Sequence, residues 1–253
     1  MRDYEIETKK RIEFIRDTIK SAGVNGIVYG NSGGKDSTLV GILCKMACDD
    51  TLGIIMPCGS KQNYGTDKTD AEKIAEQFLI ESRVVDLSEV KINFIMAMGE
   101  NTRLNDSALA NISPRLRMTV LYAIAANENR LVAGTGNRSE SYMGYFTKWG
   151  DGAYDFNPIA DLTVTEIYEY LNYLGVPDSI IKKAPSAGLF EGQTDEDEMG
   201  VTYKTIDKFL LDTTSTIDEN DRIIIEKFHA ASEHKRKLPL VFKEYLKIKG
   251  ANK

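Results

Sequence analysis

Apolar residues recur along this chain with two periods, one typical of helices and the other of short buried strands. Four runs rich in β-branched and other apolar residues predict strands, at residues 24–29, 51–56, 84–87 and 130–133. Between these runs, apolar residues return every three or four positions, which places them on one face of a helix. This spacing predicts helices at about residues 3–20, 39–46, 71–79 and 108–127.

A further helix is predicted after the last of these strands. Thr163 and Glu166 have the spacing of a capping box, in which two side chains bind free backbone N–H groups at the start of a helix. Gly175 and Pro177 are residues that end helices, so this helix is expected to stop close to Leu174.

The alternation of strands with helices predicts the fold class. Strands separated by helices of this length form parallel βαβ units, and sheets of this kind are covered by helices on both faces. We therefore expect an α/β fold with a single doubly wound parallel sheet. No internal repeat or change in composition divides the chain, so residues 1–253 are expected to form one domain. In such folds, ligands bind at the carboxyl ends of the strands.

The composition argues against several classes of protein. Lys and Arg number 32 against 38 Asp and Glu, and the net charge of −6 disfavours non-specific nucleic-acid binding. No run of about 18 apolar residues is present, so no membrane span is expected. The N-terminal residues mix acids with bases, unlike a secretory signal. Three cysteines and two histidines without zinc-binding spacing indicate reduced thiols in the cytoplasm.

The strongest chemical signal is the sequence GNSGGKDS, which follows the first predicted strand and leads into a helix. Two adjacent glycines let the backbone approach a ligand, and a helix N-terminus offers free N–H groups to an anion. The segment comprises Gly30, Asn31, Ser32, Gly33, Gly34, Lys35, Asp36 and Ser37. It is not a Walker A loop, because Tyr29 stands where that motif has glycine and Asp36 follows the lysine. A carboxylate beside a phosphate site indicates an intervening Mg²⁺.

A second polar segment, GTGNRSESYMGYFTKWGDG at residues 134–152, follows the fourth predicted strand. Thr135 and Glu140 are expected to face the same crevice as Asp36, because the carboxyl ends of parallel strands meet at one edge of a sheet. Glu140 would supply a second carboxylate for Mg²⁺, which prefers oxygen ligands. A polar loop with ordinary surface charges is the alternative interpretation of these residues.

Both segments resemble those of known families. Ser32–Ser37 resembles the SGGxDS loop of the ATP pyrophosphatases, which split ATP between the α- and β-phosphates. Residues 134–152 are similar to the GT-x-N-x-x-E…GYFTKYGDG segment of the NAD synthetases, with Trp149 in place of a tyrosine. Residues 182–189 are similar to that family's KKAPTADL, residues 195–203 resemble its D-E-x-x-x-G-x-x-Y stretch, and residues 233–236 match its EHKR. The resemblance to the NAD synthetases thus extends over essentially the whole chain.

The resemblance implies a reaction. NAD synthetases join ammonia to the nicotinate carboxylate of deamido-NAD⁺ in the last step of NAD biosynthesis. They use ATP with Mg²⁺ to adenylate the carboxylate, and they release AMP and pyrophosphate. Because that attack brings two anions together, positive charges must shield it.

The resemblance also implies a role for individual residues. The residues implied to contact ATP are Gly30 to Ser37 together with Thr135 and Ser186, and those implied to bind Mg²⁺ are Asp36 and Glu140. The residues implied to contact deamido-NAD⁺ are Arg115, Lys148, Asp155, His234 and Lys235. Lys35, Asp36 and Lys148 are the catalytic residues that the resemblance suggests.

The resemblance leads to three further expectations. Val164 stands where many members of the family have lysine, so an ATP contact is missing or comes from another residue, for which Lys182 and Lys183 are candidates. Glutamine-dependent members carry an additional amidase domain, for which this chain has no room, so free ammonia is the expected nitrogen donor. The known members are homodimers, and the same assembly is expected here.

Two segments are expected to move during the reaction. Residues 185–200 are rich in glycine and acids and lack periodicity, which predicts a mobile loop with Asp195 to Glu198 in solvent. We hypothesise that residues 188–200 and the basic tail around His234 and Lys235 are disordered without ligand and close over deamido-NAD⁺. Such a closure would protect the adenylate from water.

Two other functions are considered. A different ATP pyrophosphatase, which amidates or thiolates another substrate, would share the first loop, although a tRNA thiolase would need cysteine pairs and a basic surface. A non-catalytic nucleotide-binding module would need the phosphate loop but no second metal-binding carboxylate.

Overall fold

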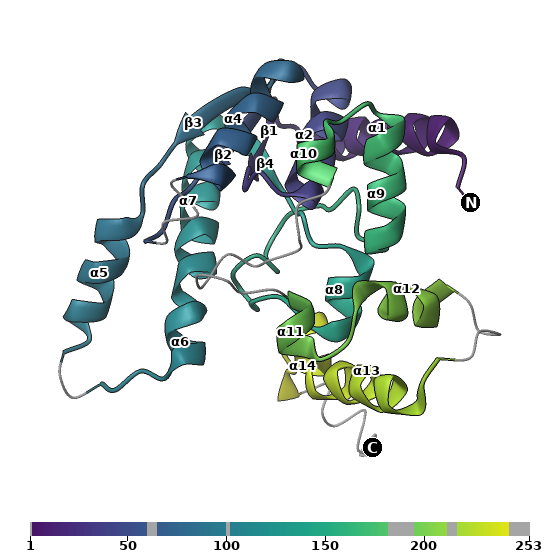
Figure 1. Cartoon of the computed structure of the whole chain (residues 1–253). Helices are drawn as coiled ribbons and strands as arrows, with labels where there is room; N and C mark the ends of the chain where they lie inside the picture. The colour runs from purple at the N-terminus through teal and green to yellow at the C-terminus, as the bar shows by residue number, and fades with distance from the viewer. Residues whose placement is uncertain (1, 60–64, 100–101, 182–194, 212–216, 243–253) are drawn as a thin grey trace, which may run out of the picture.

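The computed structural model describes residues 2–59, 65–99, 102–181, 195–211 and 217–242 of the chain. Within these ranges a four-stranded parallel sheet forms the centre of the molecule, which confirms the predicted α/β fold (Figure 1). The strands are β1 (Gly26–Gly30), β2 (Thr51–Ile55), β3 (Glu81–Val84) and β4 (Arg130–Ala133), in the order β3-β2-β1-β4. Tyr29 of β1 pairs with Gly53 of β2 and with Ala133 of β4, so β1 lies between these two strands.

The described helices have the following bounds: α1 Tyr4–Ala22, α2 Lys35–Ala47, α4 Thr66–Gln77, α5 Ser88–Ala97, α6 Asp106–Ala110, α7 Ile112–Glu128, α8 Arg138–Met143, α9 Val164–Tyr173, α10 Asp178–Ile181, α11 Asp195–Met199, α12 Tyr203–Leu211, α13 Glu219–Ala231 and α14 Glu233–Arg236. None of them is both long and apolar enough to cross a membrane.

The two faces of the sheet pack against different helices. Successive residues of a strand point to opposite faces, and in β1 the buried side chains of Ile27 and Tyr29 join the core made with α1, α2, α4 and α9. The side chain of Val28 joins a separate core made with α7, to which Leu52 and Ile54 of β2 also belong. Helices therefore cover both faces, as in a doubly wound sheet.

A third apolar cluster lies away from the sheet and joins α8, α9, α11, α12 and α13 (Figure 1). Its fully or almost fully buried residues include Met143 of α8, Met199 of α11, Ile206 of α12 and Ile225 of α13. The expectation that residues 195–198 form a loop in solvent is wrong in this respect, since α11 is a helix whose Asp195 is buried. The rest of the predicted loop, residues 185–194, lies outside the described residues.

The positions of two predicted elements are wrong. The third strand is Glu81–Val84 and not residues 84–87, because β3 is an exposed edge strand whose residues are largely polar and follow no apolar pattern. The single helix predicted at residues 108–127 is the pair α6 and α7, which meet at Asn111. Pro114 lies in the first turn of α7, where a residue without an N–H group is tolerated.

Candidate active site

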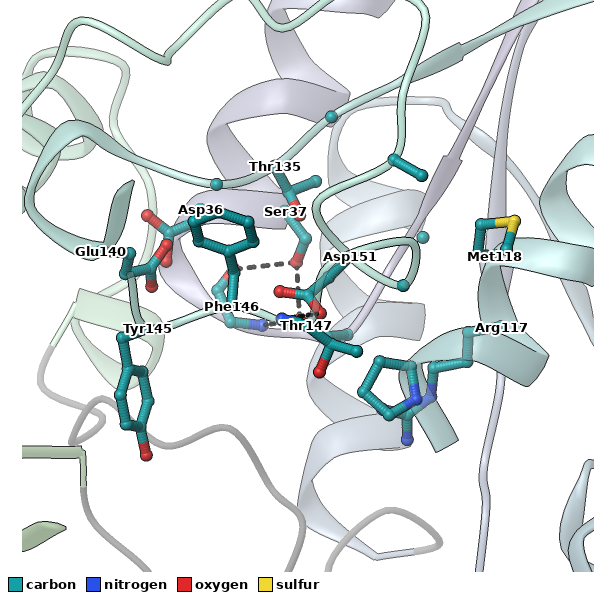
Figure 2. A pocket seen from close by; sticks show the side chains of 18 of the residues that line it. Asp36, Ser37, Arg117, Met118, Thr135, Glu140, Tyr145, Phe146, Thr147 and Asp151 are labelled. Atoms are coloured by element: carbon teal, nitrogen blue, oxygen red, sulfur yellow. Dashed lines mark hydrogen bonds between the residues drawn. The ribbon is translucent and has the colours of Figure 1, made fainter. Parts of the chain in front are cut away.

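A cavity of about 820 Å³ opens at the carboxyl ends of β1 and β4 (Figure 2). The chain leaves β1 for β2 on one side, while β4 lies on the other side, so the cavity occupies the point where the strand order reverses. That point is the usual ligand position in sheets of this kind. Its walls come from the loop after β1, the first half of α7, the segment after β4, α11, and the junction of α13 with α14.

The loop after β1 forms one end of the cavity. Helix α2 begins at Lys35, and its N-cap residue Gly34 supplies no side-chain hydrogen bond, so the first N–H groups of α2 are available to an anion. Gly33 has a φ of 72°, and a Cβ added to it would lie 2.3 Å from the Asp67 carbonyl oxygen. Only glycine fits there. The Ser32 and Ser37 hydroxyl oxygens lie 3.0 Å apart and add polar groups to the same end of the cavity.

Two carboxylates from different strand ends lie together in the cavity. Asp36 is in the first turn of α2, and Glu140 is in the first turn of α8 (Figure 2). Asn137 connects them, because its Nδ2 donates to Asp36 Oδ1 at 3.0 Å and its Oδ1 accepts the Glu140 N–H at 2.9 Å. In return, Glu140 Oε2 accepts the Asn137 N–H at 3.0 Å, which completes a capping box.

Lys35 places a buried positive charge beside these carboxylates. Its ammonium group lies 2.8 Å from Asp36 Oδ2 and faces the ring of Tyr203. Burial favours the neutral amine, but the charges of Asp36 and Glu140 outweigh it, so the pKa of Lys35 is raised. Burial and the charge of Asp36 raise the pKa of Glu140 well above its usual range, although Lys35 opposes this shift. A second cation near Glu140 would stabilise its ionised form.

This donor set fits Mg²⁺. Protein sites usually bind this ion through one or two carboxylates and leave the other positions to water and to phosphate oxygens of the substrate. Asp36 and Glu140 are such a pair, and they lie next to the loop that offers N–H groups to an anion. Within the described ranges, no three His, Cys, Asp or Glu residues are grouped so that they could hold a metal ion. A metal bound by Asp36 and Glu140 would therefore need further ligands from water or the substrate.

The other end of the cavity carries a second pair of opposite charges. Arg117 of α7 lines it and donates from Nε to the Met56 carbonyl oxygen at 3.1 Å (Figure 2). Asp151 also lines it, and its Oδ1 accepts the Thr147 N–H at 3.0 Å. The surrounding protein raises the pKa of Asp151 and lowers the pKa of Arg117 through loss of solvation.

The chain matches the NAD synthase family model over residues 7–239. It belongs to this family. It is 46% identical over 242 residues to the NH(3)-dependent NAD(+) synthetase of Carboxydothermus hydrogenoformans, and the alignment covers 94% of this chain and 98% of that protein.

Two solved structures are also similar to this chain. The NMN synthetase from Francisella tularensis superimposes with a TM-score of 0.88 at 36% identity, covering 95% of this chain and 99% of that one. The NH3-dependent NAD synthetase from Campylobacter jejuni superimposes with a TM-score of 0.76 at 33% identity, covering 96% and 100%.

Many of the residues implied by the family resemblance come together in the cavity. Those that line it are Gly30, Asn31, Ser32, Gly34, Lys35, Asp36, Ser37, Thr135, Glu140 and Lys235. Gly33 belongs to the same loop but does not line the cavity, because it packs against the backbone of α4 at Asp67. Ser186 and the two candidate lysines, Lys182 and Lys183, lie outside the described residues. Val164 is buried in the cluster that joins α8 with α12, so no charge replaces the expected lysine at that position.

Three residues implied to contact deamido-NAD⁺ form a group of their own outside the cavity lining. Arg115 donates from Nη2 to the Lys148 carbonyl oxygen at 3.3 Å. Lys148 Nζ donates to the His234 carbonyl oxygen at 2.6 Å and faces the ring of Trp149. The structure therefore brings Arg115, Lys148 and His234 together at the surface beside the cavity, and their contacts with a ligand stay predictions.

Asp155 occupies a different place from the other implied residues. Its Oδ2 accepts the Val132 N–H at 2.7 Å, and its Oδ1 accepts a bond from the Tyr122 hydroxyl at 3.3 Å. These bonds tie Asp155 to β4 and α7, and it lines a smaller surface pocket next to Phe14 of α1 instead of the main cavity.

Lys235 lines the cavity, but its ammonium group binds protein. Nζ donates to the Gly144 and Phe146 carbonyl oxygens at 2.8 and 2.9 Å. Residues 233–236 form the short helix α14 and pack against the site, and their ordering by a ligand stays a prediction. Residues 195–199 form α11, and the proposed closure of this segment over a ligand also stays a prediction.

The sequence pattern assigns no functional role to Arg117 and Asp195, which line the cavity. It also assigns none to Asn137, which lies outside the cavity lining and binds both Asp36 and Glu140. Asp195 is buried because the Tyr203 hydroxyl donates to its Oδ2 at 3.0 Å. The spacing of Asn137 and Glu140 is that of a capping box, which is a signal that could have found their mutual hydrogen bonds.

Proposed function

We propose that this chain is an ammonia-dependent NAD⁺ synthetase, a ligase that converts the nicotinate carboxylate of deamido-NAD⁺ into the amide of NAD⁺ at the expense of ATP. The observation that carries the proposal is the pair of carboxylates, Asp36 and Glu140, which share one cavity with an anion-binding loop. Relatives with this name align along nearly their whole length with the chain. Membership of the NAD synthase family supports the use of ATP.

The loop after β1 would bind the β- and γ-phosphates of ATP. The free N–H groups at the start of α2 favour negative charge through hydrogen bonds and through the helix dipole. Asp36 and Glu140 would hold Mg²⁺, which when bound neutralises phosphate charge. Lys35 adds a fixed positive charge at this end of the cavity. These groups are placed to stabilise pyrophosphate as it leaves.

The substrate carboxylate would attack the α-phosphorus, and the bond from that phosphorus to the bridging oxygen would break. Two anions must approach each other for this attack, so the positive groups in the cavity lower its barrier. Ammonia would then attack the acyl carbon of the adenylate, lose a proton to solvent, and displace AMP. Each bond that breaks is replaced by one that forms, and no redox partner is needed.

Nicotinate mononucleotide is a second candidate substrate. The specific observation in its favour is the similarity to a structure described as an NMN synthetase, with a TM-score of 0.88. The two substrates share the reacting carboxylate and the ribose phosphate, and only deamido-NAD⁺ carries an adenosine half. Residues such as Arg115 and His234, which lie beside the cavity, are the ones that could recognise this additional half.

The proposal includes a homodimer in the cytoplasm. Helix α5 has no buried residue, although it carries Val90, Ile92, Phe94 and Met96, each about half exposed or more. Large apolar side chains that are exposed together in this way mark an interaction surface. In Figure 1, α5 stands apart from the sheet, at a place that a second copy could cover. Reduced cysteines support a cytoplasmic location.

One assay tests the function. Purified protein is incubated with ATP, Mg²⁺ and ammonium chloride, with either deamido-NAD⁺ or nicotinate mononucleotide, and the nucleotides are separated by chromatography. We expect NAD⁺, AMP and pyrophosphate in equal amounts, with a higher kcat/KM for deamido-NAD⁺. A higher value for the mononucleotide would favour the second candidate, and stoichiometric ADP with phosphate would contradict both. Ammonia-free glutamine in place of ammonium should give little product.

A further inference from the structure

The C-terminal end of α8 packs against α13 and α14, and an arginine from α14 binds its last turn (Figure 1). Arg236 Nη1 donates to the carbonyl oxygens of Ser141 and Tyr142, each at 3.2 Å. Its Nη2 donates to the carbonyl oxygen of His229 at 2.5 Å. His229 Nδ1 lies 2.9 Å from the Tyr142 carbonyl oxygen, which can only accept, so this nitrogen carries the proton. One guanidinium thus joins the ends of α8 and α13.

A carbonyl group just beyond α8 is bound in the same way. Lys235 Nζ donates to the Gly144 carbonyl oxygen at 2.8 Å. Ser232 Oγ lies 3.4 Å from the Met143 carbonyl oxygen, although its single proton is directed to the nearer Phe228 carbonyl oxygen at 2.7 Å. Gly144 has a φ of 67°, and a Cβ added to it would lie 2.0 Å from the Ser232 Cβ. The backbone at the end of α8 therefore touches the junction of α13 with α14, and the carbonyl groups of Ser141, Tyr142 and Gly144 each accept a side-chain donor.

A helix as short as α8 needs such contacts. It has six residues, and the first turn of a helix forms at a net cost that only longer helices recover by themselves. Its last carbonyl groups have no partners within the helix. A positive charge at this end is favoured by the helix dipole. Arg236 provides this charge and donates to two of these carbonyl groups, Ser141 and Tyr142, of which Ser141 also accepts the Gly144 N–H.

The other end of α8 carries one half of the proposed metal site. Glu140 lies in its first turn, and Asn137 caps it while holding Asp36. Since α8 has fewer than two turns, a shift at its C-terminal end is transmitted to Glu140 through a single turn of hydrogen bonds.

We infer that Arg236 is a positioning residue for the proposed Mg²⁺ site: by fixing the C-terminal end of α8, it keeps Glu140 and Asn137 beside Asp36. This inference rests on the proposed function, because it assigns the same carboxylates to the metal. The inference gives Arg236 a role that its two neighbours do not share. Lys235 lines the cavity, and the ammonium group of Lys237 pairs with Glu233 at the surface.

The test compares Arg236→Ala, Arg236→Lys and the matched control Lys237→Ala. Mn²⁺ serves as the probe for the metal site, and its binding is measured by electron paramagnetic resonance with α,β-methylene-ATP present. Groups that orient metal ligands usually change metal affinity by 10- to 100-fold when removed. We expect Arg236→Ala to weaken Mn²⁺ binding by about tenfold, and Arg236→Lys, which keeps the charge but has fewer donors, to lie in between. Lys237→Ala should match the wild type.

Steady-state kinetics give a second measurement. In Arg236→Ala, the Mg²⁺ concentration at half-maximal rate should rise while the KM for deamido-NAD⁺ changes little. A rise in that KM alone would overturn the inference and make Arg236 a substrate contact. A folded Arg236→Ala with wild-type Mn²⁺ binding would also overturn it. If Arg236→Ala does not fold, Arg236→Lys decides by the same two criteria. Mn²⁺ binding can be measured without turnover. A wild-type protein that binds Mn²⁺ but makes no NAD⁺ would contradict the proposed function, and the comparison of Mn²⁺ binding between the wild type and the Arg236 variants would still test the inference.

Discussion

The Asn137 side chain donates a hydrogen bond of 3.0 Å to Asp36 Oδ1, across 101 positions of the chain. Through this bond the loop after β4 fixes the orientation of a carboxylate that belongs to the loop after β1. Because Asn137 is fully buried and also accepts the Glu140 N–H, one amide aligns both carboxylates of the proposed metal site. The two halves of the site are therefore preorganised by a residue that need not touch any ligand.

Replacing Asn137 separates its two roles. Asn137→Ser keeps an oxygen that can cap α8, but its short side chain does not reach Asp36. We expect the Mg²⁺ concentration at half-maximal rate to rise about tenfold, with only a small change in melting temperature. Asn137→Ala removes the cap as well and should lower stability by a further ~1 kcal/mol. Thermal unfolding without metal, together with kcat measured against Mg²⁺ concentration, checks both statements. A serine variant with unchanged Mg²⁺ dependence would refute the orienting role.

The carboxylates themselves should be essential. Asp36→Asn and Glu140→Gln remove a charge and keep the shape, so the fold should persist while adenylation is lost. Either variant should retain less than about a tenth of the wild-type kcat/KM, which corresponds to a loss of at least ~1.4 kcal/mol in transition-state stabilisation. Pyrophosphate release is the measurement. Glu13→Gln, at an exposed position of α1, is the matched control and should behave as the wild type.

The sequence was sufficient for the parts of the site whose chemistry is local. The loop after β1 and the polar segment that follows β4 are short motifs, and the βαβ alternation places both at one edge of the sheet. The sequence does not show that Arg117 lines the cavity while Arg115 does not. Residues two positions apart on a helix point to nearly opposite sides, and only the packing of α7 shows which side meets the cavity. Asp151 and Asp155 differ in the same way, since a bond to the Val132 N–H turns Asp155 toward β4.

The pattern of apolar residues also does not predict features that are exposed or that depend on long-range contacts. β3 is an edge strand whose exposed residues need no apolar alternation. The burial of Asp195 depends on a hydrogen bond from Tyr203 and on the packing of α11 against α12, which four consecutive acids do not suggest.

The pH dependence of stability should report a charge network between α1 and the segment before α9. Arg11 binds both oxygens of Asp161, at 2.7 and 2.9 Å, and Arg2 binds Oδ2 at 2.9 Å. Burial favours protonation of Asp161, but the two arginines outweigh it and lower its pKa below the ordinary value of 3.8. A lowered pKa in the folded state stabilises the fold above the ordinary pKa, and this contribution disappears as the pH falls through the lowered pKa.

Asp161→Asn should therefore lower the urea midpoint of unfolding at pH 7 and pH 5, and the difference from the wild type should shrink at pH 4 and pH 3. Asp49→Asn, at a fully exposed carboxylate, is the matched control variant. A difference that is constant from pH 7 to pH 3 would mean that Asp161 contributes through its shape and not through its charge.

The apolar surface of α5 predicts a change of assembly when it is made polar. Ile92 is 57% exposed and Met96 is 70% exposed, and these two lie one turn apart on the same side of the helix. If a second copy covers this side, Ile92→Lys with Met96→Lys buries like charges in the interface, and light scattering should show a monomer where the wild type is a dimer. Ile6→Lys is the control, because Ile6 is 47% exposed on α1, a different helix. A wild-type mass that is monomeric, or a double variant that stays dimeric, would rule out α5 as the dimer contact.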